Sequence, residues 1–232
     1  MRELQFDVGE YYHIYNRGVD CRDVFCSPAE FTRFYESLYL FNDSKYERRE
    51  TGQLNRMVLL AGSEVFSYDR DLLVSIVAFK MMTNHFHIIL REEHENGISI
   101  FMHKLGTGYT HFFNKGHGRS GSLFEGPFKA VHIQSDAQLE HSIRYAHFNE
   151  LDRHGILWRE GKVEDWCQAL DILDKDTHSS HGVYCGQSQD LPVVDLELVL
   201  GLFPDPKEYR EFLRSWAQSS IDDIPKDIWN IH

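Results

Sequence analysis

The sequence predicts an α+β domain: an antiparallel sheet with helices on one face, close to the ferredoxin-like arrangement, followed by a small helical appendage. Two observations predict this class. Local patterns indicate a strand, a helix, a two-stranded hairpin, a helix, a strand and a helix, in that order along the chain. The chain is also 232 residues long and 42% apolar, which is enough to bury a sizeable core.

The elements of the first half follow from local composition. Aromatic and β-branched residues at Tyr11–Arg17 predict a strand. Ser27–Glu30 combines an N-cap serine, a proline at the first helical position and a glutamate at the third, so a helix should run to about Asn42. Leu72–Met81 is apolar and rich in β-forming residues, and His85–Leu90 follows after a short turn at Thr83–Asn84, which predicts a hairpin.

The second half continues the alternation. Apolar residues recur at helical spacing over Phe101–Lys115. Phe128–Ile133 is a predicted strand, and the capping box Ser135–Gln138 opens a helix that should reach about Asn149. Near the end of the chain, an aspartate cap and a proline predict a helix over Asp205–Trp216.

Charge is distributed unevenly along the chain. The whole sequence has a formal net charge of −12, which would argue against a nucleic-acid partner. Residues 164–232, however, contain 14 acidic and 5 basic residues, so most of the excess lies there. We therefore expect a body of residues 1–163 and an acidic, partly helical extension of residues 164–232. Within the body, the polar stretch Asp43–Glu64 indicates a loop or irregular insertion.

The sequence also predicts a compartment. No apolar run approaches the roughly 20 residues that cross a bilayer, and the first residues lack the apolar segment of a signal peptide. The four cysteines have neither the spacing of a disulfide framework nor that of paired zinc ligands. We expect a cytoplasmic protein with free thiols and no membrane partner.

The strongest chemical pattern is a pair of histidines two residues apart. His85 and His87 would point to the same face of a strand, while Phe86 would point to the other. Two imidazoles placed in this way can converge on one divalent cation. An isolated pair is more often two polar residues on the wet face of a half-buried strand, so a metal site requires a third ligand.

The helix that ends near Asn149 offers such a ligand. Tyr145 and Asn149 lie four residues apart, on a stripe separate from the apolar face of Leu139, Ile143 and Ala146. An amide oxygen can join two imidazoles on Mg²⁺ or Mn²⁺, and a tyrosine one turn away can reach the open position of the metal. An ordinary amphipathic helix would give the same placement of Tyr145.

A basic and aromatic stretch covers residues 101–132. It contains one acidic residue, Glu125, and several phenylalanines, and its cations are Lys104, Lys115, Arg119 and Lys129. Cations for the backbone and aromatic rings for the bases suit single-stranded DNA. The alternative is a basic surface loop over buried phenylalanines.

Five segments together resemble one known family. They are Tyr12–Gly18, Phe79–Leu90, Tyr109–Lys115, Gly118–Gly126 and Ile143–Asn149. In this order they are similar to segments of the single-tyrosine HUH transposases, named for their His–hydrophobe–His motif, and most closely to the REP-associated tyrosine transposases. The resemblance covers roughly residues 9–157.

The resemblance implies a ferredoxin-like or RRM-like catalytic domain that nicks and rejoins single-stranded or hairpin DNA. By its motifs, His85, His87 and Asn149 would bind a divalent metal, Mg²⁺ or Mn²⁺, and Tyr145 would be the nucleophile that forms a 5′-phosphotyrosine link. Tyr109 is the rival nucleophile, although its apolar spacing indicates helix packing. One tyrosine per chain means that two cleavages require two active sites or a reset, which is consistent with a homodimer.

Two other functions stay open at this point. An RRM-like module could bind single-stranded nucleic acid without cutting it, and its binding would be sensitive to salt. A small hydrolase could instead hold zinc on His85 and His87 and use water as the nucleophile, with no covalent intermediate.

Overall fold

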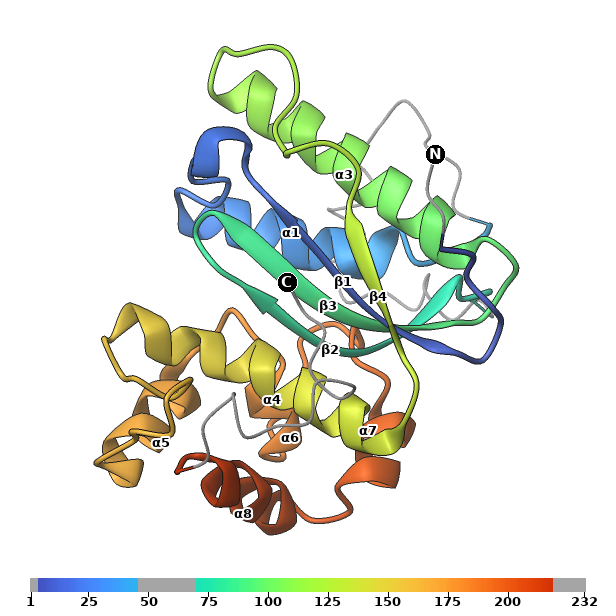
Figure 1. The fold of residues 1–232 in the computed structure, drawn as a ribbon. Coiled ribbons are helices and arrows are strands. Elements are labelled where there is room, and N and C mark those ends of the chain that lie inside the picture. Colours follow the sequence, from blue (N-terminus) through green and yellow to red (C-terminus); the bar gives the residue numbers. More distant parts are fainter. Residues whose placement is uncertain (1–3, 46–69, 219–232) are drawn as a thin grey trace.

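The computed structural model describes residues 4–45 and 70–218 and contains a four-stranded antiparallel sheet (Figure 1). The strands lie in the order β2-β3-β1-β4. Their bounds are β1 Tyr11–Arg17, β2 Val74–Met81, β3 His85–Glu92 and β4 Lys129–Ile133. All four predicted strands are present with small shifts at their ends, and the α+β class is confirmed.

The helices alternate with these strands as predicted, and further helices follow. Their bounds are α1 Pro28–Leu40, α3 Gly97–Gly116, α4 Asp136–Arg153, α5 Trp166–Lys175, α6 His181–Tyr184, α7 Leu196–Leu202 and α8 Pro206–Trp216, with a short 3₁₀ turn at Val19–Cys21. The predicted serine cap at the start of α4 is present, because the Ser135 side chain accepts a hydrogen bond from the Gln138 backbone N–H. The Gln138 side chain accepts from the backbone N–H of Gln134 rather than from that of Ser135, so the reciprocal half of the predicted capping box is shifted by one residue. The predicted helix at the end of the chain corresponds to α8.

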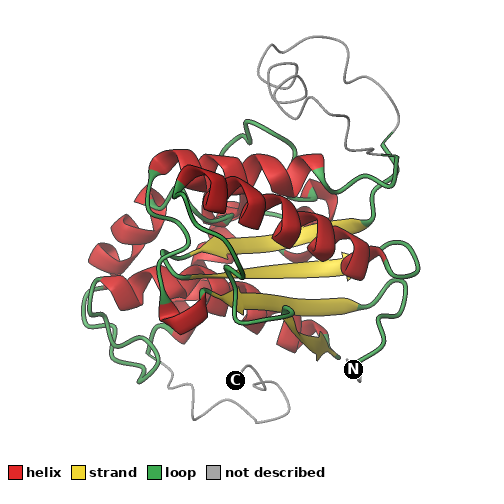
Figure 2. Cartoon of the chain, turned by 90° about the horizontal axis from the view of Figure 1, so that it is seen from above, coloured by secondary structure: helices red, strands yellow, loops and turns green. Residues whose placement is uncertain are grey.

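Helices α1 and α3 cover one face of the sheet (Figures 1 and 2). Phe86 of β3 packs on Phe34 of α1, with ring centroids 5.1 Å apart, and Phe34 packs on Tyr109 of α3. Gly108 allows the two helices to approach closely, since a Cβ atom there would lie 2.8 Å from the ring of Phe41. This face has the helical cover that the sequence predicts.

The other face is covered as well, which corrects the expectation of helices on one face only. Helix α4 lies against β2 and β3 on the side opposite to α1 and α3 (Figure 1). Its apolar residues Leu139, Ile143 and Ala146 are buried there. The physical reason is visible in β2, whose residues are all buried, because a strand with apolar residues on both sides needs cover on both sides.

The segment after α5 joins the free edge of β2. The backbone N–H of Met81 donates to His178 O, and the N–H of Ser180 donates to Phe79 O. A buried polar network continues inward, because His147 of α4 lies within hydrogen-bond distance of the Ser180 hydroxyl (2.7 Å) and the Tyr209 hydroxyl (2.8 Å). Residues 166–216 therefore share one continuous core with the sheet.

Two further predictions concern the loops and the thiols. Of the predicted irregular insertion Asp43–Glu64, residues 46–64 lie outside the described residues. The four cysteines are free, and Cys21, Cys26 and Cys167 are exposed.

Candidate active site

A pocket of about 550 Å³ lies between the sheet and α4. It brings together all four residues that the sequence predicts for the metal and the nucleophile: His85, His87, Tyr145 and Asn149. The other residues that line it are Tyr15, Asn16, Arg17, Met82, Glu125, Lys129, Asp152 and Arg159. Residues from β1, β3, β4, α4 and three loops thus meet at one place, although they are separated by up to 144 positions in the sequence.

The strand register places a row of side chains across the sheet under this pocket. His87 lies opposite Tyr15 of β1 and opposite Lys80 of β2, and Tyr15 lies opposite Lys129 of β4. Residues that are directly opposite in an antiparallel sheet project to the same face. The row explains why Tyr15 and Lys129 reach the pocket with the histidine.

The two histidines of the motif are packed edge to face. Their ring centroids are 5.1 Å apart with an interplanar angle of 89°. His85 Nδ1 lies 2.6 Å from Asn84 Oδ1, and His87 Nδ1 lies 2.9 Å from Nε2 of His13. His13 was not among the predicted site residues, because one histidine in a strand of aromatic residues gives no spacing signal.

Burial keeps these imidazoles neutral. It lowers the pKa of His13 to about 3, and burial together with the nearby cations Arg17 and Arg159 lowers the pKa of His85 to about 4. Burial, followed by the neighbouring histidines, also lowers the pKa of His87 well below its ordinary value. A neutral imidazole has a lone pair, which is the form that binds a metal ion.

Tyr145 and Asn149 are one turn apart on α4, as predicted. The Tyr145 ring lies 5.4 Å from the His87 ring and perpendicular to it, and 5.7 Å from the ring of Trp158. The Asn149 amide donates to the backbone oxygen of Tyr145 (2.7 Å) and accepts from Arg159 (3.0 Å). The side chain of Asn149 is therefore oriented by two hydrogen bonds.

Arg159 is a further site residue that the sequence reasoning missed. Its guanidinium lies 4.8 Å from the centre of the Tyr145 ring and donates to Asp152 (2.7 Å) as well as to Asn149. Burial lowers the pKa of Arg159, but the hydrogen bond with Asp152 and the proximity of Tyr145 and Asp152 outweigh burial and leave that pKa above its ordinary value. Arg159 lies in the loop after α4, where no periodicity points to it.

The donor atoms around the pocket fit a divalent metal. With protons on the Nδ1 atoms, held by Asn84 and His13, the Nε2 atoms of His85 and His87 remain available. The Asn149 oxygen accepts one hydrogen bond and has a second lone pair. Two imidazoles and an amide oxygen are ligands that Mn²⁺ and, with more water, Mg²⁺ accept.

The four predicted DNA-binding cations are not gathered at this pocket. Lys129 lines it and lies 5.8 Å from the centre of the Tyr15 ring. Lys104 donates to Asp43 O (3.0 Å), and Arg119 bridges Asn114 and Ser122 O within the turn after α3. Lys115 is exposed near the end of α3.

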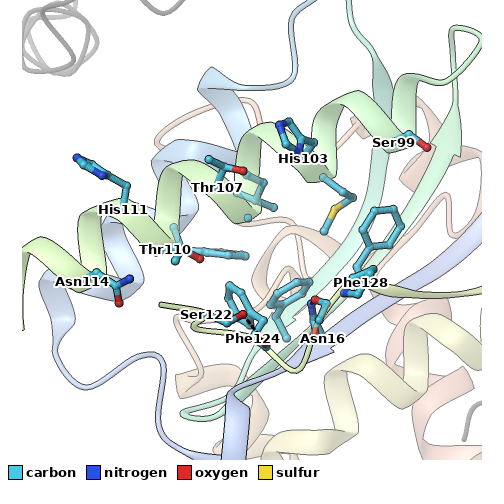
Figure 3. Close-up of a pocket in the computed structure, with 17 residues that line it drawn as sticks. Asn16, Ser99, His103, Thr107, Thr110, His111, Asn114, Ser122, Phe124 and Phe128 are labelled. Atoms are coloured by element: carbon cyan, nitrogen blue, oxygen red, sulfur yellow. Dashed lines mark hydrogen bonds between the residues drawn. The ribbon is translucent and has the colours of Figure 1, made fainter. Parts of the chain in front are cut away.

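A second pocket, of about 680 Å³, lies under α3 (Figure 3). Thr107, Thr110 and Asn114 of α3 line one side of it, and Phe124 and Phe128 line the other (Figure 3). Asn16 lines both pockets, so they are neighbours, and its side chain donates to Gly126 O.

Tyr109, the rival nucleophile, is buried away from the candidate site. Its hydroxyl donates to Val24 O (2.6 Å), and its ring packs among Phe25, Phe34 and Phe124 on the α1 and α3 face. Burial, followed by the charges of Glu30 and Cys26, raises its pKa far above the ordinary value. The Tyr109 side chain is part of the hydrophobic core, as its spacing in the sequence indicates.

No protein-family model and no curated protein match this chain. Solved structures do align with it. One is the structure of a REP-associated tyrosine transposase bound to a REP hairpin, which covers 84% of this chain and 92% of its own at a TM-score of 0.47 and 11% identity. Another is tRNA(His) guanylyltransferase from Saccharomyces cerevisiae, which covers 97% of this chain and 86% of its own at a TM-score of 0.31 and 14% identity. Similarity at this level carries no argument about what the chain binds or does.

Within the described part of the chain, no helix is both long enough and apolar enough to span a membrane.

Proposed function

We propose that this protein is a metal-dependent enzyme that nicks and rejoins hairpin-bearing single-stranded DNA through a 5′-phosphotyrosine intermediate, as a single-tyrosine HUH transposase does. One observation carries the proposal. A tyrosine, two neutral imidazoles and an oriented amide line a single pocket at the surface of the sheet. The tyrosine can act as the nucleophile, and the imidazoles and the amide can bind the metal ion that would assist it.

The proposed roles follow from these residue types. His85, His87 and Asn149 would hold the divalent ion, which when bound would polarise the scissile phosphate. Tyr145 would attack the phosphorus atom: its hydroxyl gives up a proton as a bond forms between the tyrosine oxygen and phosphorus, the bond from phosphorus to O3′ breaks, and the leaving 3′-oxygen takes up a proton. The phosphotyrosine conserves the bond energy, so a later 3′-hydroxyl can reverse the reaction and join a different end.

The charges around the pocket support a phosphate ligand. Arg17, Lys129 and Arg159 line it against two acidic residues, Glu125 and Asp152. Asp152 is engaged by Arg159 at 2.7 Å. Cations directed into a partly buried site stabilise a phosphate and the charge that develops on it during transfer.

The test is to trap the covalent intermediate and identify the residue that carries it. The full chain is incubated with end-labelled single-stranded hairpin oligonucleotides, with Mg²⁺ or Mn²⁺ or with a chelator, and resolved on a denaturing gel. We expect a protein–DNA adduct that requires the metal and maps to Tyr145 by peptide mass spectrometry. Salt-sensitive binding without any adduct would instead identify a binding module. Cleavage without an adduct would identify a hydrolase that uses water.

Arg159 is expected to assist the reaction at the tyrosine. Its guanidinium over the Tyr145 ring would stabilise negative charge on the tyrosine oxygen and on the phosphate. We expect Arg159→Gln to lower the single-turnover rate of adduct formation by about 10²-fold. Arg159→Lys should retain part of the rate, because it keeps the charge but loses the planar fork.

The matched control for Arg159 is Lys162→Gln, which removes an exposed cation three residues away whose partner, Glu160, is also exposed to solvent. This variant should react like the wild type. The measurement is rapid-quench kinetics with saturating DNA, together with a thermal melt to show that each variant is folded. A rate for Arg159→Gln within twofold of the wild-type rate would contradict the assigned role.

A further inference from the structure

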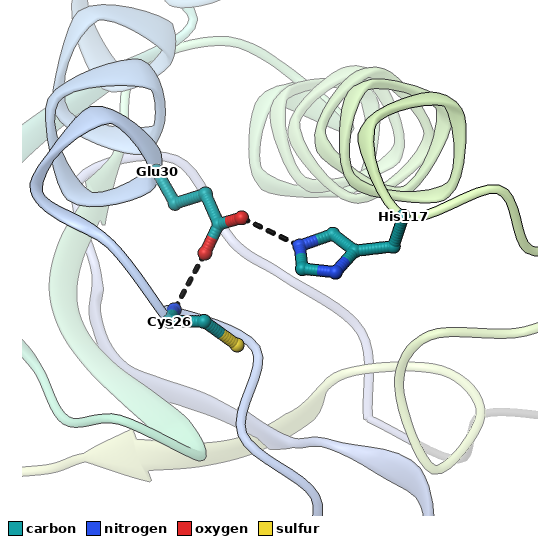
Figure 4. A group of neighbouring side chains, drawn as sticks. All are labelled: Cys26, Glu30 and His117. Carbon is teal, nitrogen blue, oxygen red and sulfur yellow. Dashed lines mark hydrogen bonds and ion pairs between the residues drawn. The ribbon is translucent and has the colours of Figure 1, made fainter.

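A second group of metal-ligating side chains lies away from the pocket between the sheet and α4. Cys26 precedes α1, Glu30 is in the first turn of α1, and His117 caps the end of α3 (Figure 4). One ligand atom from each of the three residues lies within 4.8 Å of the other two. None of the three residues lines the candidate active site.

Glu30 holds the group together. Its Oε1 atom lies 2.7 Å from His117 Nε2, and its Oε2 atom accepts a hydrogen bond from the Cys26 backbone N–H at 2.5 Å (Figure 4). The carboxylate is buried, whereas Cys26 and His117 are exposed. The His117 ring is stacked on Phe113 with centroids 4.1 Å apart, which restricts its orientation. The geometry of two of the three side chains is thus already restrained.

The ligand chemistry selects a class of ion. Thiolate, imidazole and carboxylate are the three ligands that proteins offer to zinc, and a site with three protein ligands keeps a fourth position for water. The thiolate favours zinc and related transition metals over Mg²⁺ and Ca²⁺, which prefer oxygen ligands. In a tetrahedral zinc site, with bonds of about 2.0–2.3 Å, donor atoms are about 3.3–3.8 Å apart. Glu30 Oε1 and His117 Nε2, which lie 2.7 Å apart, would therefore have to separate slightly to bind one ion.

A metal ion could reach the group from solvent, because Cys26 and His117 are exposed. Its binding would displace the proton of the Cys26 thiol. Partial burial and then the charges of Glu30 and Asp23 raise the pKa of Cys26, so that the thiol retains its proton in the metal-free protein. Binding of a divalent ion would form a sulfur–metal bond and release this proton to solvent.

A second cluster of metal-ligating side chains is less suited to a metal ion. The ligand atoms of Asp174, His181 and Cys185 also lie within 4.8 Å of one another. There, however, Arg210 donates to both oxygens of Asp174, at 2.9 and 3.0 Å. A dication would be placed next to this guanidinium, and the carboxylate would have to give up both hydrogen bonds. Among the described residues, the Glu30 carboxylate is instead bound by the Cys26 N–H and by His117, and no arginine or lysine pairs with it.

We propose that Cys26, Glu30 and His117 form a site for a zinc-class transition-metal ion. The ion would join the entry of α1 to the end of α3, the two helices that cover one face of the sheet. This site is independent of the proposed DNA chemistry, because it shares no residue with the other pocket.

Cobalt is the probe, because a thiolate bound to Co²⁺ gives a charge-transfer absorption band in the near ultraviolet that imidazole, amide and water ligands do not give. Co²⁺ is titrated into the full-length, reduced protein. We expect the band to saturate at one ion per chain, to disappear when one equivalent of Zn²⁺ is added, and to accompany a rise in the melting temperature.

Variants locate the ion. Cys26→Ser should lose the band, His117→Gln should weaken Co²⁺ binding at least about tenfold, and Cys185→Ser should behave like the wild type. The double variant His85→Ala with His87→Ala should keep the band, which separates this site from the predicted catalytic metal. The proposal is overturned if the wild type gives no thiolate band, if the band survives in Cys26→Ser, or if it is lost in Cys185→Ser.

Discussion

Tyr145→Phe is expected to abolish formation of the protein–DNA adduct, with a loss on the order of 10⁴-fold or more, because the substitution removes the atom that would bond to phosphorus. The ring contacts of Tyr145 with His87 and Trp158 remain available to phenylalanine, so the variant should fold and bind hairpin DNA. The measurement is adduct yield over time on a denaturing gel, alongside DNA affinity from fluorescence anisotropy.

Two tyrosines provide matched controls for this variant. Tyr15 lines the same pocket and stacks near His87, and Tyr109 is the rival from the sequence. Tyr15→Phe should form the adduct at close to the wild-type rate. Tyr109→Phe should also form it, although the loss of the buried hydrogen bond to Val24 should lower stability by about 1 kcal/mol. If Tyr145→Phe forms the adduct as the wild type does, the assignment of the nucleophile is wrong.

Lys80→Met is expected to have the largest effect on stability, a loss of about 3–5 kcal/mol at neutral pH. The Lys80 ammonium is fully buried and lies 2.6 Å from Glu150 and 2.7 Å from Asp176, whose side chains are 9% and 3% exposed. Removing the cation leaves two buried carboxylates without their counter-charge. The ion pair between Lys80 and Glu150 also joins β2 to α4 next to Asn149. The candidate active site should therefore become less ordered when the fold is destabilised.

The loss of stability in Lys80→Met should depend on pH, because it arises from the ionised carboxylates. Burial alone would raise the pKa of Asp176, but the charge and hydrogen bond of Lys80 lower it below its ordinary value. In the wild type this carboxylate contributes stability above its unfolded pKa of about 4, and that stability is lost as the pH falls through the lower folded pKa. In Lys80→Met burial dominates and the pKa rises, so the deficit is greatest at pH 7 and shrinks as the pH falls toward about 4.

Urea unfolding of both proteins at neutral pH and near pH 5 measures the difference. Lys175→Met is the control, because Lys175 pairs with Asp171 in solvent, with side chains 73% and 60% exposed. This control should lose less than about 0.5 kcal/mol. A loss for Lys80→Met that is no larger than that of the control, or one that does not shrink in acid, would contradict the prediction.

Much of the fold could be predicted from short-range patterns. The β1 strand was predicted with the bounds that it has, and the cap at Ser135 begins α4 as expected. Strand alternation and helix caps act within a few residues, so they are readable without tertiary information. Helices α5, α6 and α7 were not predicted, because they are short. Two of them do carry a cap in the sequence, since Asp165 and Asp195 accept hydrogen bonds from the first turns of α5 and α7.

The candidate site was predicted in part for the same reason. The His85/His87 pair follows from the period of a strand, and the Tyr145/Asn149 pair follows from the period of a helix. His13 and Arg159 could not be predicted, because each is a single residue in a segment whose pattern does not single it out. They became visible only through contacts with His87 and with Tyr145 and Asn149. The roles of all these residues stay predictions until the adduct is mapped.

By itself, the sequence determined the class of fold and the pairs His85/His87 and Tyr145/Asn149. Side chains that share a face recur every two residues in a strand and about every four in a helix, so these patterns can be recognised without the tertiary structure. Only the tertiary structure decided that α4 covers the second face of the sheet and carries Tyr145 over His87. The same packing decided that Lys80 is neutralised by Glu150 and Asp176 inside the core. These outcomes depend on which buried surfaces meet across long separations in the chain, and burial is a property of the whole fold rather than of any segment.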